Sequence, residues 1–80
     1  MISDKVRDIL DIIIPELLDK PEFYKCEIIS GGSTITAIIS CENEVSKIVG
    51  KEGRTINAIR HFIGAICSKN KFRFNLIIEE

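Results

Sequence analysis

The sequence predicts a single α+β domain, residues 1–80, in which a three-stranded sheet carries helices on one face. Helical and strand-like apolar periodicities follow one another in the order helix, strand, strand, helix, helix, strand. Eighty residues amount to one domain of chain, and 45% of them are hydrophobic, enough for a packed core. Three helices and three strands of these lengths fit one helical layer over one small sheet.

The first element is an amphipathic helix over about residues 4–19. Its apolar residues are spaced i, i+4, i+7, i+8 and i+11 from Val6 to Leu17, which places them on one helical face. Ser3 is a suitable N-cap residue. Pro15 would remove a backbone hydrogen bond and clash with the preceding turn. The sequence therefore predicts either a kink at Pro15 or a break after which a new helix starts there.

Two strand-like runs follow, over residues 24–29 and 34–40. Side chains alternate between the two faces of a strand, so each run assigns one set of apolar residues to the core. Gly31-Gly32 between the runs is a hairpin signal. The residues expected on the core face are Tyr24, Cys26 and Ile28 in the first run and Ile35, Ala37 and Ile39 in the second.

A short helix over residues 44–49 and a longer one from Arg54 to about Asn70 come next. Asn43 can cap the short helix, which stops at Gly50. Residues 72–78 then alternate as a half-buried strand with Phe72, Phe74, Leu76 and Ile78 on one face. In the longer helix, the apolar face is expected to contain Ile56, Ile59, Phe62, Ile63 and Ile66.

The connection between these two helices is Gly50-Lys51-Glu52-Gly53. Glycine at each end lets the backbone turn tightly and lets a sugar–phosphate chain approach without a Cβ in the way. The second helix begins at the loop, so its free N–H groups and positive dipole end point there. Lys51 and Arg54 add positive charge. This chemistry suits a phosphate backbone, although a GxxG spacing alone is a weak signal and also fits a simple tight turn.

This region contains two segments that resemble the motif of a known family. The segments are Ile48-Val49-Gly50-Lys51-Glu52-Gly53-Arg54 and Ala58-Ile59-Arg60. Together they resemble the signature of the KH domain, and nearly the whole chain is similar to the family of small bacterial KhpA-like RNA-binding proteins. The expected element order is that of a type II KH domain.

The resemblance implies that the chain is an RNA chaperone or regulator that holds about four unpaired nucleotides at the loop. Glu52 would oppose phosphate unless it points to solvent or pairs with a lysine or arginine, which lowers the expected affinity. The sequence places no aromatic residue as an evident platform for base stacking, so we expect modest affinity and weak sequence preference. Lys47 and Arg60 are expected either near the groove or as ordinary surface charges. The expected RNA-binding residues are Gly50, Lys51, Glu52, Gly53 and Arg54 at the backbone, Ile48, Val49 and Ile56 under the bases, and Lys47 and Arg60.

Charge is consistent with an anionic partner but does not require one. The net charge is −1, yet residues 44–78 carry seven basic and two acidic residues, whereas the rest carries four basic and ten acidic ones. Ordinary solvated surface would give the same partition. The alternative function is a protein-interaction module that forms a homodimer or pairs with a larger KH-containing RNA-binding protein, for which Phe62 and Ile63 around Gly64 offer an edge. Ribosome association is less favoured, because the domain lacks basic tails.

Other classes of function are disfavoured. One histidine and no hydrolase, metalloprotease or nucleotide-binding motif argue against an enzyme. The cysteines, Cys26, Cys41 and Cys67, are odd in number and widely spaced, so we expect buried apolar thiols and no metal or cofactor. No run approaches the roughly 20 apolar residues that span a bilayer, and residues 1–5 do not resemble a signal peptide. We therefore expect a cytoplasmic protein without membrane contact.

Overall fold

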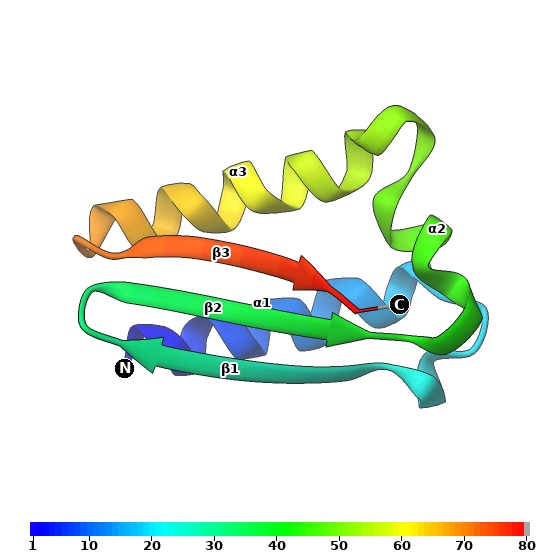
Figure 1. Ribbon diagram of the computed structural model, residues 1–80, viewed down its shortest axis with the longest axis horizontal. Coiled ribbons are helices and arrows are strands. Elements are labelled where there is room, and N and C mark those ends of the chain that lie inside the picture. The colour runs from blue at the N-terminus through cyan, green and yellow to red at the C-terminus, as the bar shows by residue number, and fades with distance from the viewer. Residues whose placement is uncertain (80) are drawn as a thin grey trace.

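The computed structural model describes residues 1–79, and its elements follow the predicted order. The sheet and helices are α1 (Ile2–Leu17), β1 (Lys25–Gly31), β2 (Thr34–Ser40), α2 (Val45–Val49), α3 (Arg54–Lys69) and β3 (Arg73–Ile78), as Figure 1 shows. Three short 3-10 turns lie between them: η1 (Pro21–Phe23), η2 (Glu42–Glu44) and η3 (Lys51–Gly53). The predicted α+β class is confirmed.

The sheet has the strand order β1-β2-β3. A hairpin turn at Gly32-Ser33 joins β1 to β2, which run antiparallel with Ile28 opposite Ala37. Strand β3 runs parallel to β2 with Leu76 opposite Ala37. A parallel neighbour needs a crossover connection, and here α2 and α3 supply it, with α3 lying beside β3 (Figure 1). The glycine loop therefore lies in the middle of this crossover.

The core lies between the helices and one face of the sheet. The inward-facing residues of β2 have no exposed surface, as the alternation predicts. Burial of such side chains supplies the main favourable term in folding. Cys41 and Cys67 are also fully buried, and all three cysteines are free, with Cys26 partly buried. The other buried contributors are Val6, Leu10 and Ile14 from α1 and Ile56, Ile59, Ile63 and Cys67 from α3.

Helix α1 differs from the sequence prediction at both ends. It begins at Ile2, so Ser3 lies inside the first turn and does not cap it. It also runs through Pro15 without a restart and ends at Leu17. Pro15 therefore falls in the last turn, and its carbonyl accepts a hydrogen bond from the Leu18 N–H at 3.2 Å.

Two further predictions are wrong. Asn43 lies within η2 and makes no capping bond, because η2 delays the start of α2 to Val45. Phe62 is 60% exposed and is not part of the core. The buried residues of α3 are spaced i, i+3, i+7 and i+11, and this spacing includes Ile63. Phe62 lies outside this buried face of the helix.

Candidate nucleic-acid interface

Gly50 begins the loop in a conformation that only glycine adopts readily. Its φ is 77° and its ψ is 176°. Its N–H donates to the Ser46 carbonyl at 2.9 Å and ends α2. A Cβ added at Gly50 would lie 2.3 Å from Thr55 Oγ1 and 3.0 Å from the Thr55 backbone nitrogen. The start of α3 therefore packs directly against this glycine, and a side chain there would push the two apart.

Two further loop residues, Glu52 and Gly53, also have a positive φ. Gly53 has a φ of 75°, and its N–H donates to the Gly50 carbonyl at 3.2 Å. An added Cβ at Gly53 would meet only Asn57 Nδ2, at 3.6 Å, so the backbone angle and not crowding favours glycine. Glu52 has a φ of 56°, which is rare for a residue with a side chain. These angles fold the four residues into one tight turn.

The charges of the loop are solvent-exposed. Lys51 is exposed and makes no ion pair within residues 1–79. The Glu52 carboxylate lies 3.7 Å from the Arg54 guanidinium, and both side chains are more than two-thirds exposed. An exposed pair of this kind contributes little and is easily exchanged for another partner. The pairing fits one of the two ways in which Glu52 can tolerate a nearby phosphate.

The N-terminus of α3 opens onto the same loop. Gly53 occupies the N-cap position of this 16-residue helix and provides no side-chain acceptor. The Arg54 N–H donates to the Lys51 carbonyl, and the N–H groups that follow it in the first turn have no side-chain cap. These donors and the positive end of the helix dipole favour an anion at this point. Lys51 and Arg54 flank them from the loop and the first turn. The arrangement can accept phosphate oxygens, and it offers no nucleophile or acid–base pair.

Lys47 has another partner in the structure. Its ammonium donates to Asp19 Oδ2 at 2.9 Å, and this hydrogen bond and the charge of Asp19 raise the pKa of Lys47. Glu44 completes the same contact between the end of α1 and α2. Its carboxylate accepts the N–H groups of Asp19 at 2.7 Å and Lys20 at 2.9 Å. Glu44 was not anticipated from the sequence, because its partners lie on a distant segment.

The apolar residues beside the loop are more buried than expected. Ile48 has no exposed surface and Ile56 is 5% exposed, so neither offers area to a base in this conformation. Their expected place on the floor of a groove stays a prediction. In the structure they anchor α2 and α3 to the core and so hold the loop between them. Val49 is partly buried and keeps some surface.

Arg60 joins α3 to the sheet. One terminal nitrogen of its guanidinium donates to the Leu76 carbonyl of β3 at 3.2 Å, and the other donates to Asn57 Oδ1 at 3.3 Å. The residue is nevertheless exposed. Arg60 therefore lies at the seam between α3 and β3, and its expected role in RNA binding stays a prediction.

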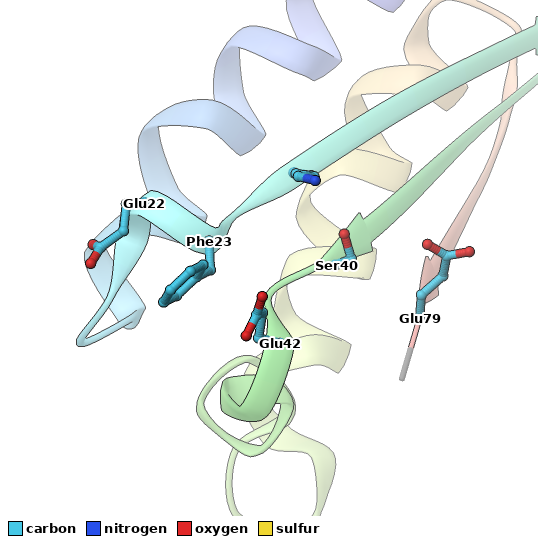
Figure 2. Close-up of a pocket in the computed structure, with 6 residues that line it drawn as sticks. Glu22, Phe23, Ser40, Glu42 and Glu79 are labelled. Carbon is cyan, nitrogen blue, oxygen red and sulfur yellow. The ribbon is translucent and has the colours of Figure 1, made fainter.

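An open hollow of about 780 Å³ lies elsewhere, at the end of the sheet (Figure 2). Three of its six lining residues are glutamates, namely Glu22, Glu42 and Glu79, and Phe23 contributes an aromatic ring. Carboxylates repel a phosphate chain, so this hollow does not suit RNA. Within the described residues, no group of three or more histidine, cysteine, aspartate or glutamate side chains is arranged to hold a metal.

Comparison with known proteins decides the family. A family profile described as the KH domain of KhpA/KhpB matches residues 7–78. The chain belongs to this family. Its α-β-β-α-α-β order and mixed three-stranded sheet are those of a type II KH domain, as the resemblance implied. The match spans the glycine loop, both flanking helices and all three strands.

Curated relatives of this KH domain carry the name RNA-binding protein KhpA. The protein from Chlamydia pneumoniae is 38% identical over 76 residues, which cover 94% of this chain and 97% of the relative. The one from Borreliella burgdorferi is 35% identical over 72 residues, 89% of this chain and 88% of the relative. The one from Clostridium perfringens is 31% identical over 65 residues, 80% and 87% respectively. No solved structure matches the chain.

These names describe RNA-binding proteins and no enzyme, in agreement with the sequence. Within residues 1–79, no helix combines the length and apolarity needed to cross a bilayer.

Proposed function

We propose that this KH domain binds single-stranded RNA at the loop Gly50–Gly53 and acts as a cytoplasmic RNA chaperone or regulator. The observation that supports this most is the conjunction of two positive-φ glycines with an N-terminus of α3 that has no side-chain cap, beside Lys51 and Arg54. The loop would hold the sugar–phosphate backbone of about four nucleotides. The names of the relatives point the same way.

The charge of the loop limits the expected affinity. Lys51 and Arg54 meet the strand as exposed cations, while Glu52 remains beside them as an anion. For single strands, the logarithm of affinity falls with the logarithm of salt concentration with a slope of about −0.7 per phosphate contacted. A loop that meets two to four phosphates should therefore give a slope between about −1.4 and −2.8. We expect weak, salt-sensitive binding.

The test is a titration of short single-stranded RNA into the wild type and the double variant Lys51→Asp with Glu52→Asp, at several salt concentrations. Both glycines remain, so the fold should survive, which circular dichroism checks. Lys5→Asp is the matched control, because it changes the net charge equally on α1, away from the loop. We expect the loop variant to bind at least about tenfold more weakly and the control to bind like the wild type. Equal binding by all three would contradict the loop as the clamp.

A second candidate function rests on the outer side of α3. Phe62 is 60% exposed, and the space around Gly64 is open, with no atom within 4 Å of an added Cβ. This apolar edge would suit a second copy of the domain or a larger KH-containing RNA-binding protein. Light scattering of the wild type and Phe62→Ser at matched concentrations tests self-association. A monomer at all concentrations would exclude the homodimer. If the loop variant binds RNA as well as the wild type does, partner binding becomes the favoured function.

A further inference from the structure

The edge of the sheet beside α3 carries free backbone groups. Strand β3 is an edge strand. The N–H of Arg73 donates to the Ser33 carbonyl at 2.7 Å, and the N–H of Glu79 donates to the Ile39 carbonyl at 2.8 Å, so these odd-numbered positions face β2. Backbone groups of alternate residues point to opposite sides within the plane of a sheet. The N–H and C=O groups of the even-numbered residues, Leu76 among them, therefore face outward.

Arg60 lies on this edge with its guanidinium plane fixed. The Leu76 carbonyl and the Asn57 side-chain oxygen belong to two different elements, and each accepts from a different terminal nitrogen of Arg60, at 3.2 Å and 3.3 Å. Arginine has five N–H donors in a rigid fork. Two are used here, and the side chain is exposed. Three donors thus remain for a ligand, on a group whose orientation is already set.

The position of Arg60 relative to the loop fits a bound strand. Gly53, Asn57 and Arg60 are spaced i, i+4 and i+7, so they share one face of α3. Seven residues of helix rise about 10 Å. Stacked nucleotides are spaced about 3.4 Å apart along a strand, so this rise corresponds to about three nucleotides. A strand held by its phosphates at the loop and running along the seam between α3 and β3 would bring a base to Arg60.

We propose that Arg60 reads one base of the bound strand and selects guanine there. The inference rests on the proposed RNA-binding function and adds to it the base preference of the same site. Guanine presents two acceptors, O6 and N7, on one edge, which match two N–H groups of a guanidinium. Adenine replaces O6 with a donor amine and leaves one arginine N–H opposed. Because the site is exposed, the preference should lie near the lower end for bidentate arginine contacts, about five- to tenfold.

A purely structural Arg60 would behave differently. If it only ties α3 to β3, its removal lowers stability without changing the relative affinities of different bases. Base selectivity is therefore the readout that separates the two roles.

The experiment compares RNA oligomers of six nucleotides, which are uridines except for one guanine or one adenine at the same internal position. We expect the guanine oligomer to bind five- to tenfold more tightly. Inosine retains O6 and N7 and should bind within about twofold of guanine, whereas 7-deazaguanine lacks N7 and should fall to the level of adenine. Equal affinity for all four oligomers would overturn the proposal.

Substitution tests the residue itself. Arg60→Lys keeps the charge but loses the fork, so it should abolish the guanine preference while leaving the salt dependence and the affinity for the adenine oligomer nearly unchanged. Arg73→Lys is the matched control, because the exposed Arg73 and the buried Leu76 lie on opposite faces of β3. This variant should keep the preference for the guanine oligomer. Circular dichroism confirms that each variant is folded at the temperature used.

The outcomes distinguish the two proposals. A guanine preference that survives Arg60→Lys would show that another residue reads the base and would overturn this inference. Loop-dependent, salt-dependent binding without base preference would overturn it as well but leave the proposed function intact. No RNA binding by the wild type would overturn both.

Discussion

The three glycines of the crossover differ in what a methyl group would meet, which allows a graded test of the loop geometry. We consider Gly50→Ala, Gly53→Ala and Gly64→Ala. Gly50 combines a positive φ with direct packing against Thr55. Gly53 has a positive φ and free space, and Gly64 lies within α3 with free space and no positive φ. Each substitution adds one carbon, so the differences come from conformation and contact alone.

The magnitudes follow from these environments. At Gly50, a φ of 77° with a ψ of 176° costs a residue with a side chain about 1–3 kcal/mol. Displacing Thr55 from 2.3 Å adds to this, so we expect a loss of about 3 kcal/mol. At Gly53, the left-handed conformation alone should cost about 1 kcal/mol. At Gly64, alanine should stabilise the helix by about 0.5–1 kcal/mol.

Urea unfolding of the wild type and the three variants, followed by circular dichroism, measures these differences. A domain of this size has a total stability of about 4–12 kcal/mol, so the loss at Gly50 should shift the midpoint strongly. Equal losses for Gly50→Ala and Gly53→Ala would refute the role of the Thr55 contact. A loss of stability for Gly64→Ala, particularly one that depends on protein concentration, would show that another chain packs on α3.

Three further predictions concern charge. Glu52→Asn should raise RNA affinity about threefold, because unit charges about 7 Å apart in water interact by about 0.6 kcal/mol and asparagine tolerates the left-handed backbone. RNA titration checks this prediction, and weaker binding would contradict it. Glu44→Ala should destabilise the domain by about 1 kcal/mol, because two N–H groups lose their carboxylate, and should leave RNA affinity unchanged; urea unfolding and RNA titration measure the two effects. Burial raises the pKa of the Cys41 and Cys67 thiols, so the unfolded chain loses these protons first. The contribution of these thiols to stability should therefore be constant below about pH 8.5 and fall above it, which urea midpoints at pH 7 and pH 10 would show.

The sequence predicted the elements well because their signal is local. Alternation in β2 and the i, i+4 spacing of α1 each report one buried face, and both faces were assigned correctly. Capping residues were less informative. Ser3 and Asn43 are favourable caps, but α1 starts two residues earlier than predicted and a 3-10 turn precedes α2, so both helix starts lie away from these residues. Such shifts depend on packing and cannot be read from residue type.

The position of the candidate site could be predicted from the sequence, but its backbone conformation and side-chain contacts could not. The glycine spacing marked the loop, whereas the positive φ of Glu52 has no sequence signal. The burial of Ile48 follows from the tertiary position of a five-residue helix, since α2 has one turn with which to anchor the loop. The partners of Arg60 and Glu44 come from distant segments, so neither contact could be anticipated from local pattern.

The parallel pairing of β3 with β2 has a consequence for how the domain forms. The hairpin of β1 and β2 can pair as soon as both strands have been synthesised, because its contacts are local. The β2–β3 pairing closes over the whole crossover and is slow by comparison. Until residues 73–78 emerge from the ribosome, Arg60 lacks its carbonyl partner and α3 lacks its neighbouring strand. The seam between α3 and β3 should therefore form only in the final step of folding, and a nascent chain that ends before β3 should lack the part of the proposed RNA site that Arg60 and Leu76 make together.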